Sequence, residues 1–354
     1  MNKSFWKNKK VLITGDTGFK GSWIALILSE AGAKIQGLSS SKFNNNIELY
    51  DYLKIGDLSN TIDADIRDHK AIMKAFADFQ PEIVFHLAAQ PLVRESYIDP
   101  VTTYEVNVMG TMNILEAIRE SSSVKSAVMI TTDKCYENNE WEWSYRENDP
   151  LGGHDPYSSS KGCAEILIKS YQKSFFNDLL KSPGISSVRA GNVIGGGDFS
   201  QDRLIPDLYK SISKKNKLFL RNPLATRPWQ HVLEPASGYI SVAEKLYSSG
   251  SAGNDSWNFG PHITDVKTVQ EVSELFCASW GVNQAIEFNS NADQLHEAQY
   301  LSLDISKAFL KLNWAPKWSI NDSIQKTAIW YKSYHEKEDV LSLSLRQIEE
   351  YFSS

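Results

Sequence analysis

Cysteine is scarce in this sequence, and neither its spacing nor that of histidine indicates a metal site. The 354 residues contain only 3 cysteines, Cys135, Cys163 and Cys277, which lie far apart and form no Cys-x-x-Cys pair. The 7 histidines also lack the short spacings of metal ligands. We therefore expect no disulfide framework and no metal, which suits a reducing compartment.

Long apolar runs and basic tracts are absent as well. No apolar stretch approaches the roughly 20 residues that a membrane helix needs. The basic start of the chain leads into only three apolar residues, 11–13, which is too short for a signal peptide. The 37 Lys and Arg residues stand against 43 Asp and Glu, a net charge of −6 without a basic cluster. We therefore expect a cytoplasmic protein that binds neither membranes nor nucleic acid.

Short β-branched runs alternate with amphipathic stretches through the first 190 residues. The strand candidates are 11–14, 34–38, 61–66, 83–87, 127–132 and 186–190. Such alternation predicts an α/β fold with a doubly wound parallel sheet and helices on both faces. One long helix candidate carries Val108, Met112, Leu115 and Ile118 at helical spacing, and another spans 157–171.

Three glycines follow the first strand candidate. Gly15, Gly18 and Gly21 stand three residues apart, so that backbone amides at a helix N-terminus can approach a pyrophosphate. A glycine cluster that only forms a turn is the alternative, and the strand-turn-helix context favours the dinucleotide site of a Rossmann sheet. We expect Asp16, within this loop, to cap the helix, because a carboxylate facing a pyrophosphate would be unfavourable.

The carboxylate that usually contacts the adenosine ribose after the second strand is missing. Residues 37–42 offer serine hydroxyls and Lys42 instead, which leaves both NAD and NADP open. Asp65 and Ile66, at the end of the third strand candidate, are candidates to flank the adenine. A solvated aspartate at a strand end is the alternative for Asp65.

The chain after residue 190 is less regular, with a glycine-rich loop at 195–197 and scattered prolines. We predict a dinucleotide-binding Rossmann domain over residues 1–190, to which 228–260 return. Residues 191–227 and 261–354 would form a smaller α/β domain for the substrate.

Tyr157 and Lys161 lie four residues apart and share one helix face. A neighbouring ammonium favours the phenolate, and a nicotinamide cation would do so further, which should bring the phenol's pKa from about 10 towards that of a working base. With Thr132 at the end of the fifth strand candidate, the pair can deprotonate a hydroxyl while hydride leaves the same carbon. We interpret His86 as a packed, hydrogen-bonded histidine, and Cys135 and Cys163 as small apolar fillers.

These motifs are similar to those of extended short-chain dehydrogenases/reductases, the NAD-dependent epimerase/dehydratase family, over nearly the whole chain. The longer runs 15–23, 88–94, 132–136, 189–198 and 227–234 resemble the CDP-glucose branch of its sugar-nucleotide 4,6-dehydratases. Asp133 and Lys134 are the informative detail. That branch resembles this chain in having Asp-Lys after the strand-five Thr, whereas simple epimerases have no such ionisable pair. An ion pair at the loop edge is the alternative.

The resemblance implies a set of site residues. Its catalytic group would be Thr132, Asp133, Lys134, Tyr157 and Lys161. The cofactor contacts would be Gly15, Thr17, Gly18, Phe19, Lys20, Gly21, Asp65, Ile66, Ala88, Ala89, Gln90, Tyr157 and Lys161. The substrate contacts would be Arg94, Asn192, Arg203, Arg227, Trp229, His231, His296 and Tyr300, for which surface or core roles are the alternative.

The resemblance also implies a reaction, the loss of water from a CDP-hexose with tightly bound NAD regenerated at each turnover. Tyr157 would take the proton of the sugar 4-hydroxyl, Lys134 the C5 proton, and Asp133 would assist departure of the 6-hydroxyl. Dimers are usual in this group, through the long helices that end near Glu120 and Tyr171. Two alternatives are another nucleotide-sugar dehydratase or epimerase, and a non-catalytic NAD(P)-binding sensor, which the Tyr157–Lys161 pair disfavours.

Overall fold

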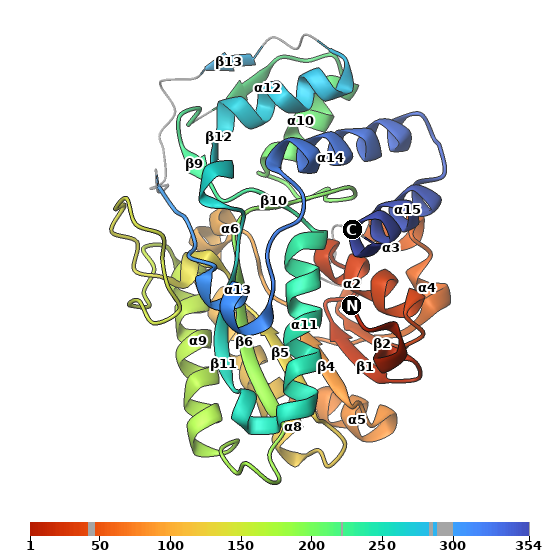
Figure 1. Ribbon diagram of the computed structural model, residues 1–354, viewed down its shortest axis with the longest axis vertical. Helices are drawn as coiled ribbons and strands as arrows, with labels where there is room; N and C mark the ends of the chain where they lie inside the picture. Colours follow the sequence, from red (N-terminus) through yellow and green to blue (C-terminus); the bar gives the residue numbers. More distant parts are fainter. Residues whose placement is uncertain (42–46, 221, 283–285, 289–299, 354) are drawn as a thin grey trace.

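A seven-stranded parallel sheet forms the centre of the molecule (Figure 1). The computed structural model describes residues 1–41, 47–220, 222–282, 286–288 and 300–353. The strands are β1 (Lys10–Thr14), β2 (Lys34–Ser39), β3 (Ser59–Asp63), β4 (Ile83–His86), β5 (Ser126–Ile130), β6 (Gly184–Ala190) and β11 (Asp255–Phe259). Their order is β11-β6-β5-β4-β1-β2-β3, with every neighbouring pair parallel. This confirms the predicted α/β fold class.

Helices cover both faces of the sheet. One face packs against α2 (Phe19–Glu30) and α11 (Leu233–Ser249), the other against α5 (His69–Phe79), α8 (Thr111–Glu120) and α9 (Pro156–Ser174). Successive residues of a strand serve opposite faces: Val11 and Ile13 join the first core, and Leu12 the second. Because both of their faces are buried, the central strands β1, β4 and β5 are largely apolar, which made them visible in the sequence.

The helix before β5 is less regular than its sequence pattern predicts. It runs from α7 (Pro100–Tyr104) through a π-helical segment, η2 (Glu105–Gly110), into α8. A π-helix places more residues in each turn, so the buried face changes register. Leu115 and Ile118 are buried, whereas Val108, in the π-helical segment, and Met112 are only half-buried.

Two strands end before the residues predicted for them. β3 ends at Asp63, and Asp65 lies in the turn that follows, where its carbonyl accepts from the Asp68 amide. β5 ends at Ile130, which leaves Thr132 beyond the sheet as the N-cap of the 3-10 helix η3 (Asp133–Cys135). The expected site residues after β5 therefore stand on a loop above the sheet.

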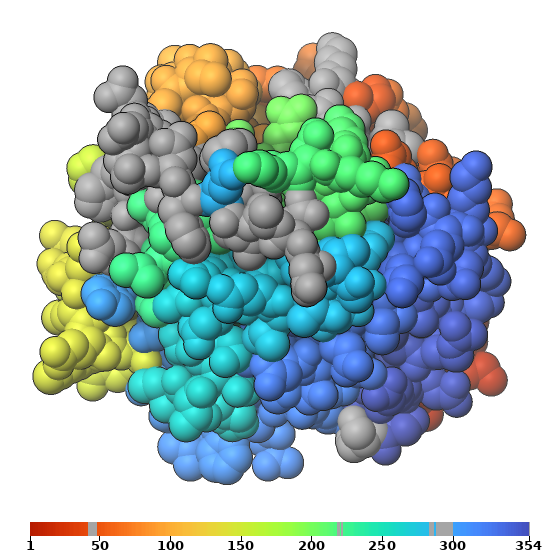
Figure 2. Space-filling model, turned by 90° about the horizontal axis from the view of Figure 1, so that it is seen from above, coloured from red at the N-terminus to blue at the C-terminus, as the bar shows by residue number. Residues whose placement is uncertain are grey.

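Smaller elements gather above the carboxyl ends of the strands (Figure 1). They include α10 (Leu204–Ser213), α12 (Val269–Trp280), α14 (Ile320–His335) and α15 (Val340–Ser353), and Figure 2 shows α12 near the middle of this face. Three two-stranded sheets accompany them: β7 (Val193–Ile194) with β10 (Gln230–His231), β9 (Thr226–Arg227) with β12 (Lys267–Thr268), and β8 (Leu218–Leu220) with β13 (Ile286–Phe288). After β10 the chain returns to the large sheet through α11 and β11.

The remaining helices are short. They are α1 (Lys3–Trp6), α3 (Ile47–Tyr52), α4 (Ile55–Leu58), α6 (Val93–Ile98), α13 (Ser306–Leu312), η4 (Gly250–Gly253) and η5 (Ile263–Asp265). No helix within the described ranges combines the length and hydropathy that crossing a membrane requires.

Candidate active site

A cavity of about 1170 Å³ lies at the carboxyl ends of the central strands. Phe19 and Lys20 reach it after β1, Ala89 after β4, and the loops after β5 and β6 complete its floor. This is where the strand order reverses between β1 and β4, the usual place of ligands in doubly wound sheets. Its volume is large enough for a nucleotide and a sugar together.

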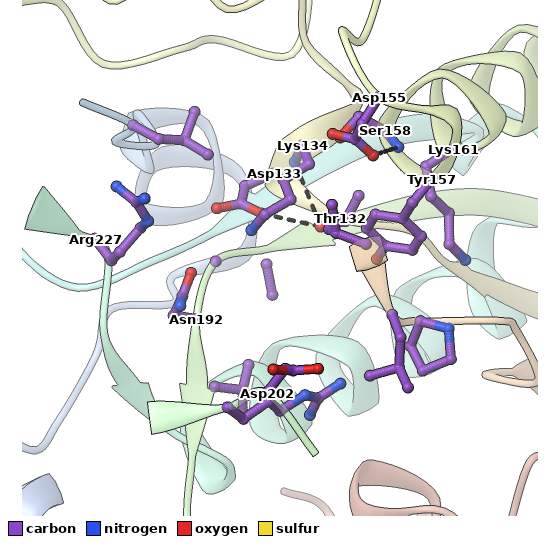
Figure 3. A pocket seen from close by; sticks show the side chains of 18 of the residues that line it. Thr132, Asp133, Lys134, Asp155, Tyr157, Ser158, Lys161, Asn192, Asp202 and Arg227 are labelled. Atoms are coloured by element: carbon purple, nitrogen blue, oxygen red, sulfur yellow. Dashed lines mark hydrogen bonds and ion pairs between the residues drawn. The ribbon is translucent and has the colours of Figure 1, made fainter. Parts of the chain in front are cut away.

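Most of the predicted site residues meet in this cavity. Those that line it are Phe19, Lys20, Ala89, Arg94, Thr132, Asp133, Lys134, Tyr157, Lys161, Asn192, Arg203, Arg227 and Trp229. Figure 3 shows Tyr157, Thr132 and Lys161 on one side, with Arg227 and Asn192 across from them. Gly15, Thr17, Gly18, Gly21, Asp65, Ile66, Ala88 and Gln90 are not among the lining residues.

Tyr157 stands at the start of α9, which Asp155 caps by accepting from the Ser158 amide. Burial raises the pKa of the Tyr157 phenol to about 12, while a hydrogen bond with the Thr132 side chain lowers it. Burial also lowers the pKa of Lys161 to about 8, and the ammonium donates to the Ile130 carbonyl at 3.5 Å. In the protein by itself, loss of solvation outweighs the neighbouring charges, and the lowering of the phenol pKa with a nicotinamide cation bound stays a prediction.

Asp133 and Lys134 project from the 3-10 turn beside Thr132. The Thr132 hydroxyl donates to Asp133 Oδ1 at 2.9 Å and accepts from the Lys134 amide at 3.4 Å. Lys134 Nζ lies 3.7 Å from Asp133 Oδ1, with the carboxylate side chain 1% exposed and the lysine 32% exposed. Asp133 Oδ2 is buried and has no hydrogen-bond partner among the described residues. An acid and a base thus lie together at the cavity wall.

A buried ion pair supports this turn, and sequence reasoning missed it. Arg189 on β6 donates to Glu165 on α9 and to the Tyr136 hydroxyl, both at 2.7 Å. The Thr131 hydroxyl donates to the other carboxylate oxygen of Glu165. Tyr136 in turn donates to Asn258 on β11 at 2.7 Å. The residues just before and just after the Asp133–Lys134 turn are thereby anchored to the sheet.

The glycine loop fits a pyrophosphate. Gly15 has φ +75° and its Cβ would lie 2.8 Å from the Ala88 amide, while a Cβ on Gly21 would lie 2.0 Å from the Gly15 carbonyl. Chain packing therefore demands both glycines. A Cβ on Gly18 would meet only one atom, at 3.3 Å, so its missing side chain leaves space in front of the α2 N-terminus.

Cations surround the same end of the cavity. Burial, with the charges of Arg203 and Lys161, lowers the pKa of Lys20 to about 7. Arg203 is held by Asp198 at 2.8 Å. The crowding of positive charge around Lys20 suits a diphosphate, which would relieve the repulsion. Among the described residues, no group of three or more His, Cys, Asp or Glu side chains could hold a metal ion.

Asp16 does not cap α2, so that expectation is wrong. The N-cap is Gly18, and the fully buried Asp16 carboxylate points away to β2 and β3, where it accepts from Ser39 at 2.7 Å and Thr61 at 2.6 Å. The hydroxyls of Ser39 and Thr61, both distant in the sequence, therefore bind the Asp16 carboxylate in place of the helix amides.

Several predicted contacts lie elsewhere. His231 is fully buried between Trp23 and Trp318, outside the cavity, which does not support a substrate contact. Tyr300 is 55% exposed and also outside it, and His296 lies outside the described residues. The Asp65 carboxylate is bound by Arg67 at 2.8 Å. Ile66 is packed in the second core.

The remaining expectations concern His86 and the cysteines. His86 is buried between the hydroxyls of Thr14 at 2.7 Å and Thr111 at 3.1 Å, which confirms a packed, hydrogen-bonded histidine. Cys135 is buried, and burial raises the pKa of its thiol. Cys163 is exposed on α9, so its interpretation as a buried filler is wrong.

Comparisons with known proteins extend over nearly the whole chain. The family profile described as GDP-mannose 4,6 dehydratase matches residues 12–327. A CDP-glucose 4,6-dehydratase from Salmonella typhimurium is 46% identical, with 100% of this chain and 99% of that protein covered. A CDP-paratose 2-epimerase from Salmonella typhi is 26% identical, covering 92% of this chain and 99% of its own.

Solved structures share the fold at lower identity. A UDP-glucose 4-epimerase from Thermotoga maritima, solved with UDP-glucose, has a TM-score of 0.80 at 19% identity, covering 92% of this chain and 99% of its own. A dTDP-glucose 4,6-dehydratase from Bacillus anthracis, in complex with NAD, has a TM-score of 0.78 at 22% identity. The match covers 94% of this chain and 99% of that chain.

Proposed function

Because this chain belongs to the GDP-mannose 4,6 dehydratase family, we propose that it is an NAD-dependent hydro-lyase acting on a nucleotide sugar. The substrate that we propose is CDP-D-glucose and the products are CDP-4-dehydro-6-deoxy-D-glucose and water, a step towards deoxysugars. The relative at 46% identity supports this choice of nucleotide. The observation that carries the proposal is the placement of Asp133 and Lys134 in one cavity with Tyr157 and Lys161.

The first step is removal of a proton from the sugar 4-hydroxyl. Tyr157 accepts this proton at its phenolic oxygen, which Thr132 orients by hydrogen bonding. The charge of Arg203 also lowers the pKa of Tyr157, and the cationic Lys161 lies one helical turn away. A dinucleotide held at the glycine loop would supply the hydride-transfer chemistry at C4 and C6.

The second step is elimination of water across C5 and C6. The 4-ketone makes the C5 hydrogen acidic. Lys134 accepts that proton at its amine nitrogen after passing one proton to the Asp133 carboxylate, 3.7 Å away. Asp133 then gives this proton to the departing 6-hydroxyl, which leaves as water. As C6 receives hydride, Lys134 gives its proton to C5, and the proton that Tyr157 took from the 4-hydroxyl restores the Lys134–Asp133 pair, so that every side chain ends as it began. The sum is loss of one water, with no net oxidation or reduction.

The nucleotide diphosphate needs cations and hydrogen-bond donors on the opposite wall. Arg227 supplies forked donors suited to phosphate oxygens, with Asn192 on the same side of the cavity (Figure 3). Arg203 supplies donors of the same kind near Lys20. Trp229 lines the same wall with its indole nitrogen donating to the Lys267 carbonyl at 3.2 Å. These four residues keep their predicted substrate-binding role in this proposal, together with Arg94 at the cavity mouth.

The proposed assembly is a homodimer in the cytoplasm. Exposed apolar side chains support it, since Ile98, Val101, Met109 and Ile166 lie on α6, α7, η2 and α9 without cover from the described chain. Light scattering on the purified protein, with Ile166→Glu as the interface variant, measures whether two copies associate through these helices.

The proposed reaction is tested by product mass. Purified protein is incubated with CDP-, dTDP-, UDP- and GDP-glucose and NAD, and the products are analysed by mass spectrometry. We expect the CDP-sugar to lose one water and the others to react more slowly. A product of unchanged mass would indicate an epimerase, and loss of water only from another nucleotide would contradict the choice of CDP.

A further inference from the structure

The proposed reaction makes no use of the buried carboxylate of Asp16. Its Oδ1 accepts from the Ser39 hydroxyl at 2.7 Å and its Oδ2 from the Thr61 hydroxyl at 2.6 Å. The hydroxyl of Tyr50 lies 2.8 Å from that of Thr61, which extends the chain of hydroxyls. Burial raises the pKa of Asp16, and the bonds from Thr61 and Ser39 oppose that rise.

The neighbouring strand is shaped around this carboxylate. An ideal Cβ on Gly37 of β2 would lie 1.9 Å from Asp16 Oδ2, so that only glycine leaves room for the side chain. Asp16 follows Gly15 directly after β1, and Ser39 is the last residue of β2, the adjacent strand. The arrangement therefore joins the glycine loop to the carboxyl end of β2.

That end of the second strand is where a Rossmann sheet receives the adenosine ribose, commonly on an acidic side chain. Here the position holds Ser39, whose single hydroxyl proton is committed to Asp16. The Ser39 oxygen is thus left as an acceptor, with only a long contact of 3.4 Å from the Thr17 amide. A ribose 2′-hydroxyl can donate to such an oxygen.

A 2′-phosphate fits the same place badly. It carries roughly −1.5 to −2 charges at neutral pH and its oxygens are acceptors. It would meet the Ser39 oxygen, which has no free proton to donate, and the buried carboxylate of Asp16 lies directly behind that oxygen. We propose that Asp16, acting through Ser39, is the positioning residue that selects NAD over NADP in this protein. This inference rests on the proposed dinucleotide site.

A second carboxylate at the same edge provides the matched control. Asp63 ends β3 and accepts from the Ser41 amide at 2.9 Å and the Ser41 hydroxyl at 2.7 Å. It is exposed, so its charge is screened by solvent. If simple negative charge near β2 sets the preference, removing Asp63 should matter as much as removing Asp16.

The experiment is equilibrium binding of NADH and NADPH, followed by dinucleotide fluorescence without substrate. We expect the wild type to bind NADH more tightly, and Asp16→Asn to shrink the NADPH to NADH ratio of Kd by about tenfold. Asp63→Asn should leave the ratio within about twofold. Ser39→Ala, which keeps the carboxylate, should weaken NADH binding and leave NADPH binding nearly unchanged.

The outcomes separate the two proposals. An unchanged ratio in a folded Asp16→Asn protein, or a shift in Asp63→Asn alone, overturns the role of Asp16 while the dinucleotide site stands. If Asp16→Asn fails to fold by circular dichroism, unchanged NADH binding in Ser39→Ala overturns it. Failure of the wild type to bind either dinucleotide overturns the cofactor site, and with it the proposed function.

Discussion

Arg189 and Glu165 form a buried ion pair directly behind the turn that carries Asp133 and Lys134. The guanidinium and carboxylate are 2.7 Å apart, with side chains 2% and 1% exposed. Burial alone would raise the pKa of Glu165, but the charge and hydrogen bonds of Arg189 hold it below its usual value. Arg189 Nη1 also donates to the hydroxyl of Tyr136, the residue directly after this turn.

Breaking this pair should destabilise the whole protein. Arg189→Met leaves the Glu165 carboxylate buried without its partner, which typically costs about 3–5 kcal/mol of unfolding free energy. Urea unfolding followed by fluorescence measures the loss. The exposed pair of Lys74 and Asp78 is the control, because Lys74→Met should change stability by less than about 1 kcal/mol. Equal effects from both substitutions would contradict the buried role.

Much of the fold is readable from the sequence because its signals are local. The central strands β1, β4 and β5 are largely apolar because both of their faces are covered, and the glycine loop follows β1 within a few residues. The neighbours Trp229 and His231 show where such reading fails: both were expected in the cavity, and only Trp229 lines it. Whether residue 229 or residue 231 faces the cavity depends on Trp23 and Trp318, which pack against His231 and are far away in the sequence.

The orientation of Asp16 also could not be predicted from its neighbours in the sequence. Its orientation depends on Ser39 and Thr61, and on the absence of a side chain at Gly37, none of which is near it in the chain. The π-helical segment 105–110 likewise results from packing, and the hydrophobic periodicity of the sequence does not reveal it. Asp133, Lys134, Tyr157 and Lys161, by contrast, are carried by short motifs on adjacent elements.

Replacing Lys134 should separate the two halves of the reaction. Lys134→Met leaves Tyr157 and Thr132 in place, so oxidation at C4 continues while proton removal from C5 stops. With C5-deuterated substrate, we expect NADH absorbance to accumulate, retention of deuterium, and a fall in kcat of about 100-fold or more. Tyr157→Phe is the control, since it should prevent NADH accumulation. Wild-type loss of deuterium in Lys134→Met would refute the assigned role.

Binding of the diphosphate should depend on pH through Lys20. Burial and the charges of Arg203 and Lys161 lower its pKa to about 7, so the empty site holds a largely neutral amine above that pH. A bound anion favours the ammonium, and binding therefore takes up a proton. We expect affinity for NADH to weaken as pH rises above about 7. Calorimetry in buffers of different ionisation enthalpy measures the uptake, and Lys20→Arg should abolish it. An unchanged proton uptake in Lys20→Arg would exclude Lys20.

Acid should destabilise the protein through two buried histidines. Burial lowers the pKa of His86 and of His231 to about 3, whereas an unfolded histidine titrates near 6.5. The unfolded chain therefore binds more protons between these values, and stability is present above about pH 6.5 and declines as pH falls towards 3. The positive charges of Lys161 and Lys326 lower the pKa values of His86 and His231, respectively, still further.

The measurement is the urea midpoint across that pH range. Replacing His231 by Phe keeps an aromatic ring between Trp23 and Trp318 and removes one titrating group. We expect the dependence of unfolding free energy on pH to become shallower by the equivalent of about one proton in His231→Phe. The exposed His69 is the matched control, and His69→Gln should keep the wild-type slope. If His231→Phe retained the full slope, other groups would account for the acid sensitivity.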